Sequence, residues 1–123
     1  MASDIRGPRV LVVEDDGLLR RLVVRALQQK TDSVVPCGDA TAAKAALADG
    51  PFDAAAVDIN LPDGSGLEVI ERTRSLNPEA GIVAVTGHVG VEVAVRSMKA
   101  GADDFLTKPF EIEVLWHIIN KSV

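Results

Sequence analysis

The sequence has little of what several protein classes require. It contains one cysteine, Cys37, so no disulfide can form within the chain, and without a histidine or cysteine motif around it we expect a small buried side chain rather than a reactive thiol. The net charge of −5 leaves no excess of lysine and arginine for direct nucleic-acid binding. The longest apolar run is too short to span a membrane, and residues 1–4 lack the basic and apolar regions of a signal peptide, so we expect a cytoplasmic protein.

The length of 123 residues is that of one domain, and 47% apolar with 25% charged residues is an ordinary globular balance. A chain of this size can bury roughly two-thirds of its unfolded surface. We expect residues 1–8 to be a loose N-terminal tail and residues 9–123 to form the domain. The chain contains no linker, internal repeat or low-complexity stretch.

Short apolar runs alternate with helical patterns along the whole chain. The runs that we expect to be strands are 10–13, 33–37, 54–57, 82–86 and 104–107. The expected helices are one that contains residues 19–27, then 41–48, 66–76 and 89–100, and a last one with an apolar stripe over 112–119. This alternation predicts right-handed crossovers and a parallel sheet with helices on both faces.

A few residues predict where two of the helices begin and which strand lies at an edge of the sheet. Asp39 or Thr41 is expected to cap the second helix, and Ser65 followed by Glu68 has the spacing of a capping box at the start of the third. Pro36 predicts that residues 33–37 form an edge strand, because proline has no N–H to donate to a ladder.

Polar residues follow four of the expected strands at the point where each strand ends. They are Glu14-Asp15-Asp16 after the first, Asp58 after the third, Thr86-Gly87-His88 after the fourth and Lys108-Pro109 after the fifth. Ligands of open α/β sheets bind outside the carboxyl ends of the strands, so we expect these groups to converge at one edge. Acids, a hydroxyl and an amine together can hold a divalent cation and a phosphoryl group.

Electrostatics also predict a cation at this edge. Glu14, Asp15 and Asp58 would bring three negative charges together, and like charges ~4 Å apart cost roughly 4 kcal/mol per pair at an effective dielectric near 20. Such a cluster is stable only with a cation nearby. Mg²⁺, which prefers carboxylate, water and phosphate oxygens, together with Lys108 would balance the three acids.

These motifs resemble the receiver domain of two-component response regulators, a chemotaxis-regulator-like superfamily. The matching residues are Glu14-Asp15, Asp58, Thr86, Lys108-Pro109, the loop 61–66 and the segment 100–105, and the resemblance covers about residues 9–121. It implies an α/β, doubly wound (βα)5 flavodoxin-like three-layer fold whose five-stranded parallel sheet has the order 2-1-3-4-5. It also implies a phosphorelay signalling domain, not an enzyme, with self-phosphorylation from small donors and autodephosphorylation.

The resemblance implies a role for each acid. Asp58 accepts a phosphoryl group from a sensor histidine kinase or a histidine phosphotransfer protein. Asp15 and Asp58 bind Mg²⁺ directly, Asn60 binds it through its backbone carbonyl, and Glu14 acts through water. Asp16 is expected to be a solvated loop acid.

The resemblance also implies a switch. Lys108 would hold a phosphoryl oxygen or, at rest, the Asp58 carboxylate, and a cis Lys108–Pro109 peptide would aim it into the site. Thr86 would move to hydrogen-bond the phosphoryl group, and Phe105 would fill the space that Thr86 leaves. Phe105 stands where receivers often have tyrosine, and without a hydroxyl it gains nothing polar from an outward position.

The output and the lifetime of the phosphoryl group are implied in the same way. Asn60 and His88 flank the expected path of the attacking water and would tune dephosphorylation. The signal would leave through the fourth helix, fifth strand and fifth helix, toward an effector domain or a partner protein. The apolar residues of the fourth helix fit either an effector or a homodimer face.

Two other protein classes with a similar sheet were considered from the sequence. A haloacid-dehalogenase-like phosphatase needs an Asp-x-Asp pair after the first strand, whereas Asp58-Ile59-Asn60 follows the third. A flavodoxin-like nucleotide-binding module needs a glycine-rich loop after the first strand, where this chain has three acids that would repel phosphate. The output stays open between a stand-alone response regulator and the receiver piece of a longer transcriptional regulator, since residues 102–110 resemble receivers of sigma-54-type activators.

Overall fold

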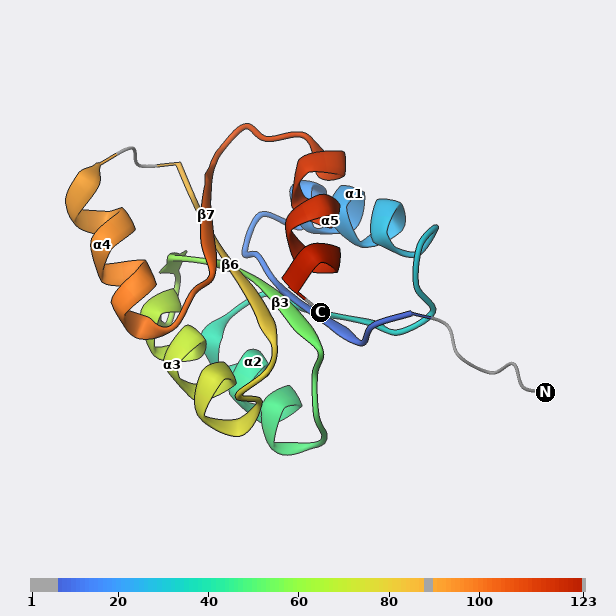
Figure 1. Cartoon of the computed structure of the whole chain (residues 1–123), viewed down its shortest axis with the longest axis horizontal. Helices are drawn as coiled ribbons and strands as arrows, with labels where there is room; N and C mark the ends of the chain where they lie inside the picture. The colour runs from blue at the N-terminus through green and yellow to red at the C-terminus, as the bar shows by residue number, and fades with distance from the viewer. Residues whose placement is uncertain (1–6, 88–89, 123) are drawn as a thin grey trace.

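The computed structural model describes residues 7–87 and 90–122, and its centre is a five-stranded parallel sheet (Figure 1). The strands are β1 (Val10–Val13), β2 (Val34–Cys37), β3 (Ala54–Asp58), β6 (Gly81–Thr86) and β7 (Asp104–Thr107), in the order β2-β1-β3-β6-β7. Two short strands, β4 (Asn60–Leu61) and β5 (Gly64–Ser65), form a separate antiparallel hairpin. Without them the sheet order is 2-1-3-4-5, which confirms the predicted topology.

Five helices cover the two faces of the sheet. α1 (Gly17–Leu27) and α5 (Ile112–Ser122) lie on one face, and α2 (Ala40–Ala48), α3 (Gly66–Leu76) and α4 (Val91–Ala100) lie on the other (Figure 1). The predicted three-layer, doubly wound fold is therefore confirmed. None of the helices in the described part of the chain combines the length and the apolarity that crossing a membrane requires.

Each face of the sheet has its own apolar core, because successive side chains of a strand point to opposite faces. Along β1, Leu11 and Val13 pack against α2 and α3, whereas Val10 and Val12 pack against α1 and α5. The inner strands are buried on both faces, which explains why they appear in the sequence as unbroken apolar runs. Cys37 is buried in the first core, and this burial raises the pKa of its thiol, in agreement with a packing role.

Two predicted helix starts need correction. α2 begins at Ala40 because the Asp39 carboxylate accepts a hydrogen bond from the N–H of Ala42, so Asp39 is the cap and Thr41 lies inside the helix. α4 begins at Val91 and not at residue 89, because Gly90 is extended and forms the N-cap. The edge position that Pro36 predicted for β2 is confirmed.

The segment between β3 and α3 also differs from its prediction. Residues 61–66, expected to be a plain loop, contain most of the β4–β5 hairpin. The Ser65 hydroxyl caps α3 by accepting from the N–H of Leu67, and the Glu68 carboxylate pairs with Lys44 at 3.2 Å instead of completing a capping box. The range of α3 itself is as predicted.

The expected loose tail falls mainly on residues 1–6, which lie outside the described residues. At its end, the carbonyl of Pro8 accepts a hydrogen bond from the Thr31 hydroxyl. The boundary of the domain at residue 9 stays a prediction.

Candidate functional site

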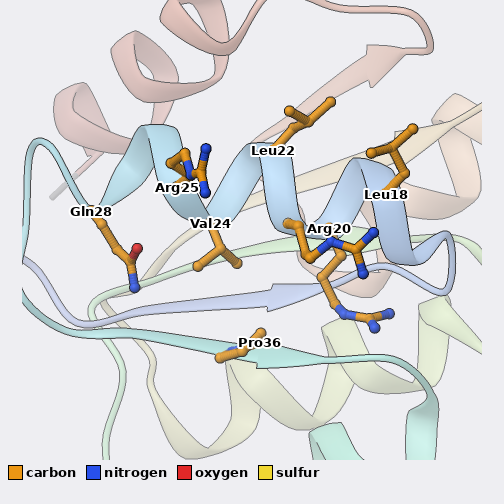
Figure 2. Close-up of a pocket in the computed structure, with 8 residues that line it drawn as sticks. Leu18, Arg20, Leu22, Val24, Arg25, Gln28 and Pro36 are labelled. Atoms are coloured by element: carbon orange, nitrogen blue, oxygen red, sulfur yellow. The ribbon is translucent and has the colours of Figure 1, made fainter.

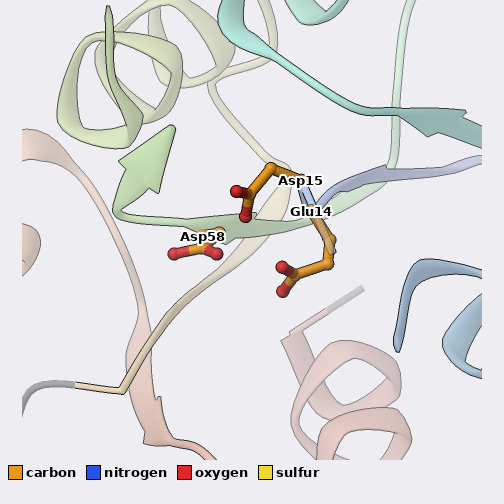
Figure 3. A group of neighbouring side chains, drawn as sticks. All are labelled: Glu14, Asp15 and Asp58. Atoms are coloured by element: carbon orange, nitrogen blue, oxygen red, sulfur yellow. The ribbon is translucent and has the colours of Figure 1, made fainter. Parts of the chain in front are cut away.

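Three acids meet at the carboxyl edge of the sheet. Glu14 and Asp15 directly follow β1, and Asp58 is the last residue of β3, which is adjacent to β1 (Figure 3). One carboxylate oxygen from each lies within 4.8 Å of the others. Glu14 is 5% exposed and Asp58 is 3% exposed, whereas Asp15 faces solvent. The structure therefore brings together the three acids that the strand ends predicted to meet.

Lys108 is the cation of this cluster. Its Nζ lies 2.8 Å from Oδ2 of Asp58 and 2.8 Å from Oε1 of Glu14. Burial alone would lower the pKa of Lys108, but the hydrogen bonds to Asp58 and Glu14 outweigh it and raise that pKa. The backbone N–H of Lys108 donates to the carbonyl of Thr86 at 2.8 Å, and the Lys108–Pro109 peptide is cis. The lysine is thus charged and directed at two of the acids.

Glu14 is held by both its side chain and its backbone. Its Oε2 accepts a hydrogen bond from the N–H of Asp16 at 3.1 Å, and its carbonyl accepts one from the Arg20 guanidinium at 2.7 Å. Burial is the largest influence on the carboxyl and raises its pKa, with Asp58 adding repulsion and Lys108 opposing both. A second buried acid beside Asp58 is therefore costly unless a further cation is present.

Asp58 is fixed by the start of the β4–β5 hairpin. Its Oδ1 accepts a hydrogen bond from the N–H of Asn60 at 2.9 Å. A Cβ atom at Gly66 would overlap the carbonyl oxygen of Asp58, so only glycine fits where α3 begins behind this strand end. From the sequence, Gly66 was expected to end a loop and begin a helix, with no role at the site.

The remaining predicted residues lie around this centre. Thr86 ends β6 and is fully buried, and Phe105 on β7 is half-buried against the core under α2 and α3. Asn60 is exposed in β4. His88 lies outside the described residues. Asp16 is exposed as expected, but its carboxylate also caps α1 by accepting from Leu18 and Leu19, a role that the sequence analysis missed.

One surface groove is lined by residues outside the acidic cluster. It has a volume of about 420 Å³ and runs between α1 and β2, lined by apolar and arginine side chains that include Leu18, Leu22, Arg25 and Pro36 (Figure 2). None of the three acids lines it. Of its lining residues, Arg20 contacts the acidic cluster, through the carbonyl of Glu14.

The acidic cluster fits a hard divalent cation. All three donors are carboxylates, and oxygen ligands are what Mg²⁺ and Ca²⁺ prefer. Lys108 compensates one of the three negative charges and leaves two for such an ion. Two of these acids are almost fully buried, so the cluster differs from the solvated acidic groups of an ordinary surface.

Comparison with known proteins agrees with this site. The family model "Response regulator receiver domain" matches residues 10–120. The virulence transcriptional regulatory protein PhoP of Salmonella typhimurium is 41% identical over 105 residues, which are 85% of this chain and 47% of that protein. The chain spans about half the length of the first curated relatives that it matches.

Two solved structures are similar along most of the chain. A CheY-like response regulator receiver domain protein from Methanospirillum hungatei has a TM-score of 0.86 and 31% identity, covering 92% of this chain and 90% of that one. A response regulator from Burkholderia pseudomallei, solved with a phosphorylated aspartic acid, a calcium ion and citrate, has a TM-score of 0.86 and 27% identity, covering 92% and 66%.

The family match excludes the alternative hypotheses of a haloacid-dehalogenase-like phosphatase and a flavodoxin-like nucleotide-binding module. Receiver domains bind a divalent metal at an acidic pocket of this kind and pair with histidine kinases and effector domains. Because the match covers almost the whole described chain, the protein belongs to the receiver domains of two-component response regulators, which are phosphoacceptor signalling domains and not classical enzymes.

Proposed function

We propose that Asp58 of this receiver accepts a phosphoryl group from a sensor histidine kinase or a histidine phosphotransfer protein. The observation that carries the proposal is the position of Lys108, whose Nζ is 2.8 Å from both Asp58 and Glu14 within a cluster of three acids. Lys108 can remain close to the Asp58 carboxylate and bind a negatively charged phosphoryl group attached to it. The Burkholderia relative, solved with a phosphorylated aspartic acid, supports the same chemistry.

The transfer forms one bond and breaks one. An oxygen of the Asp58 carboxylate bonds to phosphorus while the P–N bond of the donor phosphohistidine breaks, and the histidine nitrogen keeps the electron pair. Such transfers depend on positioning and charge neutralisation more than on covalent help from the protein. Asn60 positions the carboxylate through its N–H. Lys108, which donates to Asp58 before transfer, would donate to a phosphoryl oxygen afterwards.

We assign the metal to the acidic cluster and propose that it is Mg²⁺. Asp15 and Asp58 would bind it directly, Asn60 through its backbone carbonyl and Glu14 through water. When bound, the ion neutralises charge on the cluster and on the phosphoryl oxygens. The calcium ion in the Burkholderia relative supports a divalent site of oxygen ligands, and Mg²⁺ is the finer assignment.

The switch would use Thr86 and Phe105. Phe105 pairs in register with Ala84, two residues before Thr86 on the neighbouring strand, so the two side chains are diagonal neighbours on one face of the sheet. A shift of Thr86 toward a phosphoryl group would open space that Phe105 can fill. The change would reach an effector domain or partner protein through α4, β7 and α5, and Asn60 with His88 would set the lifetime of the phosphoryl group.

Intact-mass spectrometry tests the central step. The protein is incubated with Mg²⁺ and acetyl phosphate, and we expect one added phosphoryl group in the parent and none in Asp58→Asn or with a chelator. Asp53→Asn is the matched control, because Asp53 lies just before the same strand at its opposite end, where its carboxylate binds the N–H of Arg9. It should be modified like the parent.

Two results would contradict the proposal. One is an unmodified parent under conditions that modify another receiver domain and with a histidine-phosphorylated donor as well. The other is equal modification of the parent and Asp58→Asn, which would place the acceptor at another residue.

A further inference from the structure

The hairpin that follows Asp58 is fastened at its turn by Asp63. Oδ1 of Asp63 accepts a hydrogen bond from the N–H of Ala40 at 2.7 Å. Oδ2 accepts one from the N–H of Thr41 at 3.0 Å and one from the Thr41 hydroxyl at 2.5 Å. Ala40 and Thr41 begin α2, so the turn of the hairpin is tied to a helix that starts 23 residues earlier in the chain.

This contact is a helix cap supplied from outside the helix. The first N–H groups of a helix have no acceptor within it, and a negative charge there also interacts favourably with the helix dipole. Asp39 satisfies the N–H of Ala42, and Asp63 satisfies the two N–H groups before it. The hydrogen bond from Thr41 is the largest of several that hold the pKa of Asp63 at about 2, so Asp63 is charged at neutral pH.

The other end of the hairpin is fastened to the phosphoacceptor strand. The N–H of Asn60 donates to Asp58, and the N–H of Gly66 donates to the carbonyl of Ile59 at 2.9 Å. Across the hairpin Asn60 pairs with Ser65. The segment that carries the carbonyl of Asn60 is therefore clamped between β3 at its base and α2 at its turn.

α2 is a firm support for this clamp. Ala40, Ala43 and Leu47 are buried in the core between α2 and the sheet. Gly64 of the hairpin lies next to Ala40, since an added Cβ would be 3.4 Å from the Cβ of Ala40. The turn thus rests on a helix that is itself anchored, so the position of the hairpin follows from that of α2.

We propose that Asp63 is a positioning residue for the metal site, which holds the carbonyl of Asn60 in place by tying the hairpin to α2. The inference rests on the proposed function, in which that carbonyl is a metal ligand. A backbone ligand is oriented by the segment that carries it, and partners that orient metal ligands typically change metal affinity 10–100-fold when they are removed. Asp63 acts on the metal through the hairpin and does not touch it.

Mg²⁺ titration of ¹⁵N-labelled protein, followed by amide chemical shifts, tests this role with Asp39→Asn as a matched control. Asp39→Asn and Asp63→Asn each remove one carboxylate from the same helix start, but only Asp63 reaches the hairpin. We expect Asp63→Asn to weaken Mg²⁺ binding about tenfold. Asp39→Asn should change it by less than about twofold, because the Asp39 carboxylate bonds to the N–H of Ala42 within α2 and does not tie the hairpin to the helix. Before any metal is added, Asp63→Asn should shift the amide signals of Asn60 and Leu61.

A second pair of variants tests the other partner of the contact. Thr41→Val removes the hydroxyl that donates to Asp63, and Thr41→Ser keeps it. Thr41→Val should weaken Mg²⁺ binding about threefold, and Thr41→Ser should restore the affinity of the parent. This pair decides the question if Asp63→Asn does not fold.

The outcomes separate the inference from the function on which it rests. Equal loss of affinity in Asp39→Asn and Asp63→Asn, or unchanged affinity in both Asp63→Asn and Thr41→Val, overturns the positioning role while the metal site stands. A parent that shows no Mg²⁺-dependent shifts contradicts the proposed metal site itself, and the inference falls with it.

Discussion

At each end of the sheet a basic side chain binds a group of polar atoms, and the two groups differ. At the amino ends of β6 and β7, Arg74 donates to the carbonyls of Gly101, Pro78 and Ala80 and forms an ion pair with Asp103 at 2.8 Å. At the carboxyl ends, Lys108 is shared by Glu14 and Asp58, with Asp15 close by. The first cluster is balanced in charge, and the second carries two uncompensated negative charges.

The difference separates structural from functional polar groups. Arg74 joins the C-terminal end of α4 to the start of β6, and each of its contacts is complete without any other molecule. The cluster around Lys108 lowers the stability of the metal-free protein, because its like charges repel one another. Burial also disfavours the charged form of Glu14 and raises its pKa. A protein retains such an imbalance where a cation and a phosphoryl group are to bind.

The largest expected effect comes from filling the space behind Asp58. Gly66→Ala would place a methyl group against the carbonyl of Asp58, and we expect it to lower the free energy of unfolding by about 3 kcal/mol. Gly87→Ala, at the same edge of the sheet, is the control. Among the described residues, its chain neighbours aside, no atom lies within 4 Å of its added Cβ, so its effect should stay within about 0.5 kcal/mol. Urea unfolding of the two variants measures the difference. If the two variants unfold with equal free energies, the backbone behind Asp58 can shift to accept a methyl group at residue 66.

Removing either Lys108 or Arg74 should destabilise the protein in the absence of metal. Lys108→Met leaves the buried Glu14 and Asp58 carboxylates without their shared cation and should cost about 2 kcal/mol in metal-free solution. The cost is less than for a fully buried pair because Lys108 is partly exposed. Arg74→Met should cost about 2 kcal/mol by removing the cation paired with Asp103 and the donor to several carbonyls. Urea unfolding with a chelator measures both losses.

Mg²⁺ should then separate the two variants. It should recover much of the loss in Lys108→Met, because an ion that binds the folded state stabilises it and here replaces the missing positive charge. It should leave the gap between Arg74→Met and the parent unchanged. If both gaps respond equally to Mg²⁺, the assignment of one cluster to structure and the other to function is wrong.

The smallest effect concerns Asp63, an acid at the functional end whose contacts are complete. Its pKa in the folded protein is about 2, below the ordinary 3.8, chiefly because the Thr41 hydroxyl donates to it. The stability that it contributes is therefore present above roughly pH 4 and is lost as the pH falls through about 2. The free energy of unfolding of Asp63→Asn should lie below that of the parent at neutral pH, and the two curves should converge between roughly pH 4 and pH 2. A gap that stays constant over this range would contradict the role of the charge.

Much of the fold could be predicted because its signals are local. β1 and β3 are apolar on both faces, so their runs are visible in the sequence, and Asp58 and Glu14 are found at the ends of those runs. The order of the strands came from the resemblance to receiver domains. The hairpin of β4 and β5 was missed because strands of two residues have no periodicity to detect.

The site could be predicted only in part. Asp58, Asp15 and Glu14 were recognised from their places after strands, whereas the capping of α2 by Asp63 and the network of Arg74 had no sequence signal. Their partners lie more than 20 residues away in several cases, and a lone aspartate in a loop or an arginine on a helix is expected on any surface. Asp16 shows the same limit at short range, because a cap and a solvated acid look alike in the sequence.

The sequence by itself determined which segments become strands and which acids follow them, because burial on both faces demands apolar runs and a chain must turn where a strand ends. Tertiary structure alone decided that one lysine serves both Glu14 and Asp58 and that Asp63 holds the start of α2. These contacts depend on how the crossovers bring side chains and backbone groups of distant segments within about 3 Å of one another, the reach of a hydrogen bond. That placement results from the packing of the whole domain.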